Sequence, residues 1–275
     1  MLEVRHVSFG YGERPVLKDV SFRVGKGSLV ALLGPNGCGK TTLLKTMLGL
    51  LPVQSGDVLF ENESVTGLDR RGLARRIAYV PQIHRASFAF RVLDVVLMGR
   101  IPHKGFWTSY NRADEALAMA ALDKLGIAHL HDRPYTEISG GERQMALIAR
   151  ALCQGAHTFI LDEPANGLDY GNQIKLLEQL AELATEGYTF VMSTHFPDHV
   201  LWVASQVVML RGGRVVAEGA TDDVVTRKNL CHLYQADVQV WQLLENFKIC
   251  VPERLRSRLC DGQSHFMPQA MYDAC

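Results

Sequence analysis

One loop, residues 34–41, constrains the fold of this chain more than any other stretch, because it matches the pattern G-x-x-x-x-G-K-[ST] without a gap. An apolar run over residues 29–33 precedes the loop, and a helix-like stretch over 42–48 follows it. The glycines allow backbone N–H groups to turn inward around an anion, and the helix N-terminus adds its partial positive charge. We expect Lys40 to reach the β- and γ-phosphates of a nucleotide and Thr41 to place its hydroxyl on Mg²⁺. A chance glycine turn would not combine strand, loop, Lys-Thr pair and helix, so the stretch predicts a nucleotide site.

The composition favours a globular chain over a membrane-spanning or nucleic-acid-binding one. Its 275 residues can bury a full core and fit about one or two domains. Lysine plus arginine and aspartate plus glutamate balance at 29 each, so no strongly basic field favours nucleic acid as a partner. The apolar runs fall short of the ~20 residues that a membrane span needs, and residues 1–6 lack the apolar core of a signal peptide. We therefore expect a cytoplasmic chain whose six cysteines, without any Cys-x-x-Cys pair, are free thiols.

The hydrophobic pattern predicts an α/β fold. Residues 2–7 and 20–24 alternate as strands do, and buried apolar strands over 158–161 and 188–193 flank an amphipathic helix over 173–185. Such alternation of strands and helices indicates a mainly parallel sheet that is covered on both faces.

A helical stretch interrupts this pattern, since helical spacing dominates residues 92–152. We expect one nucleotide-binding domain over residues 1–235, with a helical subdomain inserted over about 84–152. Residues 236–275 then form an extension without an assigned role, in which 241–244 favours a short helix.

Two carboxylates, Asp162 and Glu163, end the apolar run over 159–161. Ligands in open α/β sheets bind at the carboxyl ends of the strands, where this pair falls. Asp162 can hold Mg²⁺, directly or through water, and Glu163 can polarise an attacking water. Because a carboxylate beside a triphosphate needs Mg²⁺ to offset the repulsion, we expect Thr41 and Asp162 to share one ion. Taken alone, the pair is an acidic strand end, but the upstream loop favours the catalytic interpretation.

Residues 139–141 predict a second anion site. Ser139 suits a helix N-cap, and Gly140 and Gly141 expose the first N–H groups of the helix. One nucleotide does not need two such sites, and the fragment alone favours an ordinary capped helix.

Together these motifs resemble the ATP-binding subunits of ABC transporters over roughly residues 1–235. Residues 34–42 are similar to the Walker A motif, 138–144 to the signature motif, 159–163 to Walker B and 166–169 to the D-loop. The resemblance implies a P-loop NTPase core with a mainly parallel sheet, an N-terminal antiparallel β subdomain and an inserted helical subdomain. It implies catalytic roles for Glu163 as general base and for His195 and Gln82 as γ-phosphate sensors. It places on Mg²⁺ the residues Thr41, Gln82 and Asp162. It places on ATP the residues Tyr11, Gly34, Pro35, Asn36, Gly37, Cys38, Gly39, Lys40, Thr41, Thr42, Ser139, Gly140, Gly141 and Asp169.

Taken singly, three of these assignments have plainer alternatives. His195 would more often be a loop histidine, Gln82 a turn residue after Pro81, and Tyr11 a surface aromatic instead of an adenine platform.

The resemblance also implies partners. Two copies would pair head to tail around two ATP molecules, so that Ser139 of one chain caps the γ-phosphate bound by Lys40 of the other. This arrangement would explain the second anion site. A permease dimer in the membrane and, indirectly, a substrate-binding protein would complete the transporter, with this chain lying peripherally on the cytoplasmic face of the inner membrane.

The segment over residues 88–103 is similar to importers of iron–siderophores, haem, vitamin B12 and, in some members, molybdate or tungstate. Its Gly99-Arg100-x-Pro-His pattern favours the iron–siderophore branch, while the run over 88–99 also resembles molybdate-type members. An exporter ATPase, or a protein that acts on ribosomes or DNA, is the alternative from another class. Apolar and aromatic residues after Gln82 suit the groove that receives a permease helix, among them Phe88, Phe90, Phe106 and Trp107.

Three positions carry separate expectations. Asn166-Gly167 stands where Ser-Ala or Thr-Ser is more usual, from which we expect altered dimer coupling, not loss of hydrolysis. Ile138 replaces the usual leucine of the signature, a conservative change. For Cys38, the helix dipole and Lys40 could lower the thiol pKa, so that alkylation would block hydrolysis and MgATP would protect. The alternative that we favour for Cys38 is a tolerated small residue.

Overall fold

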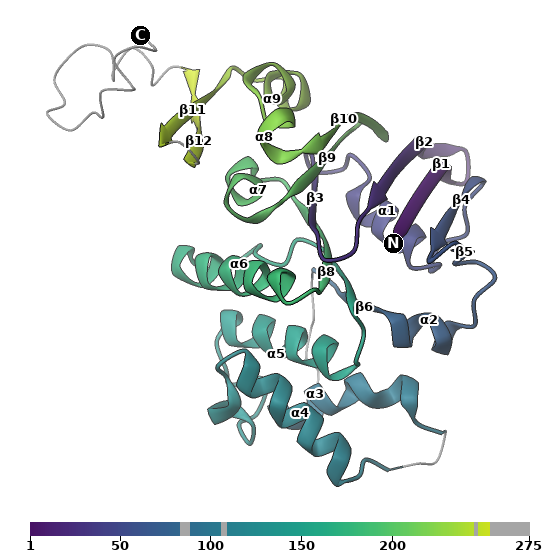
Figure 1. Cartoon of the computed structure of the whole chain (residues 1–275), viewed down its shortest axis with the longest axis vertical. Helices are drawn as coiled ribbons and strands as arrows, with labels where there is room; N and C mark the ends of the chain where they lie inside the picture. The colour runs from purple at the N-terminus through teal and green to yellow at the C-terminus, as the bar shows by residue number, and fades with distance from the viewer. Residues whose placement is uncertain (83–88, 106–108, 245–246, 254–275) are drawn as a thin grey trace, which may run out of the picture.

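Two β-sheets form the framework of this computed structural model, which describes residues 1–82, 89–105, 109–244 and 247–253 (Figure 1). The first sheet is antiparallel, with the strand order β2-β1-β4-β5. Its strands are β1 (Leu2–Tyr11), β2 (Arg14–Val24), β4 (Ser55–Phe60) and β5 (Glu63–Ser64). Alternate apolar side chains such as Val4, Val7 and Val20 are buried, which confirms the strands expected near the N-terminus.

The second sheet has six strands in the order β10-β9-β3-β8-β7-β6. These strands are β3 (Leu29–Leu33), β6 (Ile77–Val80), β7 (Thr158–Leu161), β8 (Thr189–Thr194), β9 (Gln206–Arg211) and β10 (Arg214–Ala220). All neighbours pair in parallel except β9 and β10, which form an antiparallel hairpin. The turn of this hairpin uses Gly212 and Gly213, both at positive φ. The expected mainly parallel sheet is therefore confirmed, and its strands β3, β7 and β8 end at one edge.

Helices cover both faces of the parallel sheet. Helix α1 (Lys40–Met47) lies between the two sheets, because Leu43, Leu44 and Met47 pack in one core with residues of both. On the other face, α6 (Tyr170–Thr185) and α5 (Gly140–Cys153) bury their apolar sides against β7 and β8.

Further helices lie on the α5 side of the molecule. They are α2 (Arg70–Arg76), α3 (Val92–Leu97), the 3₁₀ helix η1 (Met98–His103), α4 (Arg112–Lys124) and the 3₁₀ turn η2 (Ala128–Leu130). Of these, α3, α4 and η1 contact α5, and α3 and α4 lie at the lower end of the molecule in Figure 1. Buried Asp114 of α4 holds this group together, because it accepts hydrogen bonds from Arg100, Lys104 and the Asn111 backbone. No helix within the described ranges is long and apolar enough to cross a membrane.

The last described elements pack beside β3 and β9 of the six-stranded sheet. They are α7 (Pro197–Val203), α8 (Thr221–Val224), α9 (Arg227–Tyr234), β11 (Val238–Leu244) and β12 (Phe247–Pro252). The short helix expected over 241–244 is wrong, because these residues lie in β11, where Trp241 pairs with Ile249 of β12. Val238 and Val240, two residues apart, both pack against the core formed with α7 and α9. This period of two is that of a strand and not of a helix.

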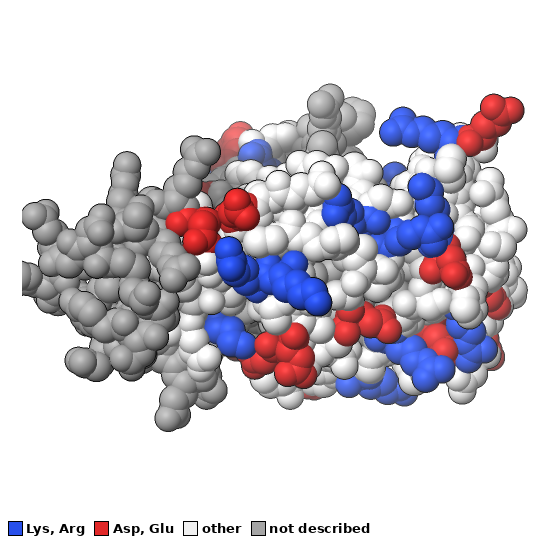
Figure 2. Space-filling model, turned by 90° about the horizontal axis from the view of Figure 1, so that it is seen from above, with Lys and Arg blue, Asp and Glu red and all other residues white. Residues whose placement is uncertain are grey.

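On the face seen in Figure 2, basic and acidic side chains are interspersed over the described surface. This pattern matches the overall balance of 29 charges of each sign. Ion pairs also join opposite charges among the described residues, as between Arg76 and the carboxylates of Glu61 and Glu63.

Candidate functional site

The loop between β3 and α1 forms the base of the candidate site. Gly37 and Gly39 adopt φ of 77° and 110°, a region that only glycine enters without strain. Gly34 has no room for a side chain, because a Cβ there would lie 2.3 Å from the carbonyl oxygen of Leu210. Lys40 is buried, and its Nζ donates to the carbonyl oxygens of Gly34 at 2.8 Å and Pro35 at 3.3 Å. The lysine thus curls back over a loop whose backbone can wrap an anion.

A cleft of 490 Å³ opens above this loop, within the range of roughly 300–1,000 Å³ that is typical of ligand pockets. Its lining brings together seven of the 14 residues expected on nucleotide, joins them with Gln82 and Glu163, and adds Arg14, Val16 and Asn166. The lining residues are Tyr11, Arg14, Val16, Asn36, Gly37, Gly39, Lys40, Thr41, Thr42, Gln82, Glu163 and Asn166. Tyr11 is 54% exposed and packs its ring edge-on against Phe9 with centroids 5.0 Å apart, so its outer face is open at the cleft.

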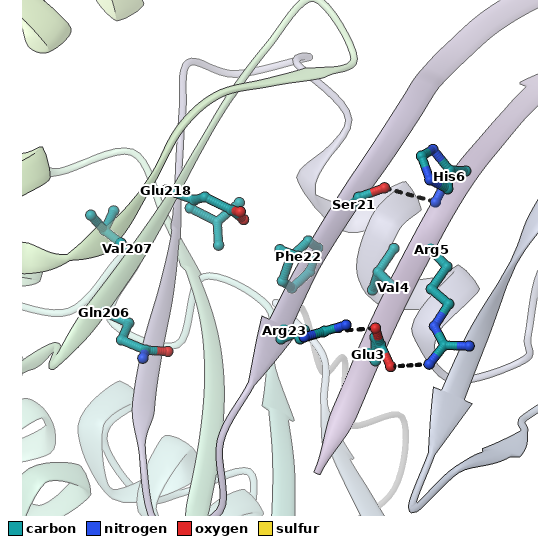
Figure 3. A pocket seen from close by; sticks show the side chains of 12 residues that line it. Glu3, Val4, Arg5, His6, Ser21, Phe22, Arg23, Gln206, Val207 and Glu218 are labelled. Carbon is teal, nitrogen blue, oxygen red and sulfur yellow. Dashed lines mark hydrogen bonds and ion pairs between the residues drawn. The ribbon is translucent and has the colours of Figure 1, made fainter.

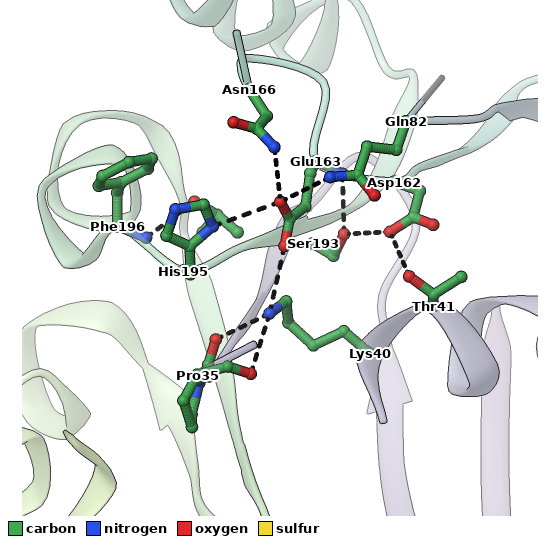
Figure 4. A network of polar contacts seen from close by, with 12 residues as sticks. Pro35, Lys40, Thr41, Gln82, Asp162, Glu163, Asn166, Ser193, His195 and Phe196 are labelled. Atoms are coloured by element: carbon green, nitrogen blue, oxygen red, sulfur yellow. Dashed lines mark hydrogen bonds and ion pairs between the residues drawn. The ribbon is translucent and has the colours of Figure 1, made fainter. Parts of the chain in front are cut away.

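Glu163 is the centre of a polar network at the carboxyl ends of the strands (Figure 4). Its Oε1 lies 3.3 Å from Lys40 Nζ. Its Oε2 accepts from Gln82 Nε2 at 3.1 Å and from Asn166 Nδ2 at 3.2 Å. His195 Nδ1 also lies 3.3 Å from Oε2, although without the alignment of a hydrogen bond. The expected trio of Glu163, His195 and Gln82 is therefore brought together by three separate strand ends.

Asp162 and Thr41 also meet, as the sequence predicts for a shared ion. Thr41 Oγ1 donates to Asp162 Oδ1 at 3.1 Å. The same carboxylate oxygen accepts from Ser193 Oγ at 2.8 Å, and Ser193 in turn accepts from the backbone N–H of Glu163 at 2.8 Å. A hydroxyl and one carboxylate suit Mg²⁺, which is held by few protein oxygens together with substrate phosphates. Gln82 points its amide nitrogen at Glu163 in this arrangement.

The backbone of Glu163 is itself unusual, because its φ of 46° places a non-glycine residue in the left-handed region. Such conformations cost about 1–3 kcal/mol and persist where the surroundings hold them. Here the Ser193 hydroxyl and a turn to Asn166 N, which donates to Glu163 O at 3.0 Å, hold the backbone.

The loop after β8 carries His195 and is supported from several sides. The Phe196 ring lies 4.0 Å from the His195 ring, and the Tyr234 hydroxyl donates to the His195 carbonyl oxygen at 2.8 Å. Nearby His199 is buried, and burial lowers its pKa to about 4, so it is neutral at pH 7. A further contact holds the start of α7, where Cys250 N of β12 donates to Asp198 Oδ1 at 2.9 Å.

Ser139, Gly140 and Gly141 do not line this cleft. Ser139 caps α5 as expected, accepting from Glu142 N at 3.2 Å in a capping box. Asp169 caps α6 through the N–H of Asn172. Gly141 lies against Asn172, which places residues 139–141 beside the start of α6 with Ser139 and Gly140 exposed.

The expectation of a lowered thiol pKa at Cys38 is wrong. Cys38 is buried, and this burial raises its pKa in spite of the opposing charge of Lys40. The favoured alternative, a small packed residue, describes its surroundings.

A separate hollow of 590 Å³ lies between β2 and the hairpin of β9 and β10 (Figure 3). Its most buried charge, Glu3, accepts from Arg5 at 2.6 Å and from Arg23 at 2.7 Å. These two partners hold the pKa of Glu3 at about 2. Because the charges satisfy one another, this hollow has the character of a structural ion-pair cluster, and the cleft at Lys40 is the candidate site.

Two functional contacts were missing from the sequence-based assignment. Ser193 bridges Asp162 and Glu163, and Asn166 bonds the Glu163 carboxylate. Ser193 had a signal, since it is a polar residue that directly follows the buried apolar residues Phe190, Val191 and Met192.

A family model described as "ABC transporter" matches residues 17–166. The manganese transport system ATP-binding protein of Bacillus subtilis is 38% identical over 239 residues, covering 85% of this chain and 92% of the relative. The ferric enterobactin transport ATP-binding protein of Escherichia coli is 36% identical, covering 85% and 86%. The molybdate import ATP-binding protein of Haemophilus influenzae is also 36% identical, covering 85% and 87%.

Solved structures show the same architecture. A metal-chelate type ABC transporter in an inward-facing conformation has a chain that matches with a TM-score of 0.81 and 34% identity, covering 91% of this chain and 96% of that one. A dimeric ATP-binding cassette bound to ADP and phosphate matches with a TM-score of 0.69 and 25% identity, covering 80% and 99%. The sequence match, the shared architecture and the cleft together show that the chain belongs to the ABC transporter family, as one of its ATP-binding, ATP-hydrolysing subunits.

Proposed function

We propose that this chain is the ATPase subunit of an importer that takes up an iron–siderophore or a related metal chelate. The observation that carries the ATPase mechanism is the convergence of Lys40, Gln82 and His195 on the Glu163 carboxylate within one cleft. Each of these groups comes from a different segment of the chain, and together they supply a cation, an amide and an imidazole around one candidate base.

In the proposed mechanism, ATP enters with its phosphates over the loop of residues 34–41. Lys40 exchanges the carbonyl oxygens of Gly34 and Pro35 for phosphate oxygens. Thr41 and Asp162, with Gln82 as a further ligand, would hold Mg²⁺, which offsets the charge of the phosphates. Glu163 accepts a proton from the attacking water, and His195 donates to the γ-phosphate.

Hydrolysis in this proposal requires a second copy of the chain. The capped α5 N-terminus at Ser139 is an exposed anion-binding end that lies outside its own cleft. The dimeric cassette structure among the relatives supports pairing of such chains. Residues 139–141 of one copy would then cover the γ-phosphate held by Lys40 of the other.

A groove between α2 and η1 is proposed to receive a helix of the permease. This groove of 830 Å³ is mainly apolar, and its lining includes Leu50 and Ile101, each 58% exposed. Exposed apolar residues gathered in one hollow favour a protein partner. Phe90 is 46% exposed, whereas Phe88, Phe106 and Trp107 of the expected contact lie outside the described residues. Such docking would hold the chain peripherally on the cytoplasmic face of the membrane, below a substrate-binding protein.

The substrate proposal rests on the relatives and on residues 99–103. The ferric enterobactin relative and the metal-chelate structure support an iron chelate. A molybdate importer is the second candidate, because the molybdate relative is equally similar in sequence.

The test of the ATPase mechanism replaces Glu163 by Gln. This variant should bind ATP as the wild type does and lose on the order of 10²–10⁴ in turnover. Fluorescent-nucleotide binding and phosphate release, measured on the same sample, separate the two effects. Wild-type turnover in E163Q would remove Glu163 from the proposed role.

The test of the importer proposal reconstitutes the chain with its permease and binding protein in vesicles. ATP-dependent uptake of a labelled ferric siderophore would support the first candidate. Uptake of molybdate without the siderophore would support the second.

A further inference from the structure

The turn that follows β7 folds back onto the residue at its start. Asn166 N donates to Glu163 O at 3.0 Å, and the Asn166 side chain donates from Nδ2 to Glu163 Oε2 at 3.2 Å. Figure 4 shows the amide approaching the carboxylate from the side opposite Lys40. Since a carboxylate only accepts, the amide must present its NH₂ group there. Glu163 is thus held at its backbone and at one carboxylate oxygen by the same residue.

The other partners of Glu163 come from elsewhere in the chain. Lys40 stands on α1 and Gln82 follows β6, while His195 follows β8. In the proposed mechanism Lys40 and Gln82 exchange this carboxylate for phosphate and Mg²⁺ when nucleotide binds. Asn166 has no such competing ligand in that scheme, and it lies in the same turn as Glu163. It therefore remains beside Oε2 when the others leave.

We propose that Asn166 is a positioning residue for Glu163, an inference that rests on the proposed role of Glu163 as the base. The amide fixes Oε2 and leaves Oε1 facing the side of the cleft where Lys40 lies. A glutamate side chain otherwise samples many rotamers, and restricting them to one reactive orientation removes an entropic loss from the reaction. Small displacements of a reacting group can cost up to ~10²-fold in rate.

Substitutions at Asn166 test this assignment. N166A removes the donor, and we expect kcat to fall about ten-fold with KM for ATP unchanged within about two-fold. N166D keeps the shape but places a second carboxylate beside Glu163, so it should lower kcat further than N166A. N166S, which keeps a hydroxyl donor, should recover part of the loss. Gln179→Ala is the matched control, because Gln179 Nε2 also donates to a carboxylate three residues away, Glu182 Oε2 at 3.2 Å, on the exposed side of α6.

A double variant separates positioning from a dimer contact. If Asn166 acts through Glu163, adding N166A to E163Q should not lower the residual turnover further, and ATP-dependent dimer formation of E163Q on size-exclusion chromatography should persist. Loss of that dimer on adding N166A would overturn the inference in favour of a contact between copies. If N166A has the wild-type kcat while E163Q is inactive, the inference about Asn166 is overturned and the proposed role of Glu163 stands. Wild-type turnover in E163Q would remove the proposed function, and this inference with it.

Discussion

Removing the Ser193 hydroxyl should destabilise the whole protein as well as its site. The hydroxyl is fully buried, donates to Asp162 Oδ1 at 2.8 Å and accepts from Glu163 N at 2.8 Å. A hydrogen bond to a charged group contributes about 1.5–3 kcal/mol, and a buried N–H left unpaired costs about 1–3 kcal/mol. Asp162 still accepts the hydrogen bond from the Thr41 hydroxyl in this variant, which reduces the free-energy cost of the first loss. We therefore expect S193A to lower the free energy of unfolding by about 3 kcal/mol.

Urea unfolding measured by circular dichroism tests this value. With a slope of about 3 kcal/mol/M, the midpoint should fall by about 1 M. Ser28→Ala is the control, because its hydroxyl donates to Gly25 O at 2.8 Å near the surface and should cost about 0.5 kcal/mol. ATP turnover should also fall in S193A, since the Glu163 backbone loses one of its two supports. A midpoint shift no larger than that of S28A would refute the reasoning.

Three further outcomes are expected from other parts of the structure. Cys38 should react with iodoacetamide at pH 7 more slowly than a free thiol, because burial raises its pKa. Timed mass spectrometry can compare the reaction rate of the folded protein in buffer with that of the unfolded protein in urea. Equal rates would contradict this expectation. Lys104 is the main cause that lowers the pKa of Asp114 from 3.8 to about 2, so its ionised form stabilises the fold above pH 3.8. D114N should therefore have a lower melting temperature than wild type at pH 7. The difference in melting temperature should shrink as the pH falls from 3.8 to about 2, and a constant difference would contradict this reasoning. G99A should lower the melting temperature by about 5 °C, because its Cβ would lie 2.2 Å from a carbonyl oxygen of α5. G72A should not lower it, because the nearest atoms to its Cβ, those of Asp69, would lie 4.0 Å away.

The parts of the site that lie in one local stretch could be predicted from the sequence. Lys40 and Thr41 belong to one strand–loop–helix unit, and Asp162 and Glu163 end a buried strand, so their chemistry follows from local order. The partners of Glu163 could not be predicted in the same way. Its meeting with His195 depends on β8 lying beside β7, which is a matter of strand order and not of spacing.

The fold shows the same division. Alternating and continuous apolar runs predicted strands in both sheets, because those runs are long enough for a period to be read. The run over 241–244 is too short to show a period. It is a strand because it pairs with β12, which lies outside the run. At Cys38 the sequence shows the neighbouring Lys40 but not the depth of burial, and burial is the larger effect.

The contacts that support His195 have a consequence for how the protein is made. Tyr234 and Cys250, which hold the loop after β8, follow the phosphate-binding loop by most of the chain. Since synthesis runs from the N-terminus, a growing chain presents Lys40 long before these supports leave the ribosome. During that interval the loop that carries His195 lacks these two contacts. Full support of this loop therefore depends on β12, a strand that is made late in synthesis.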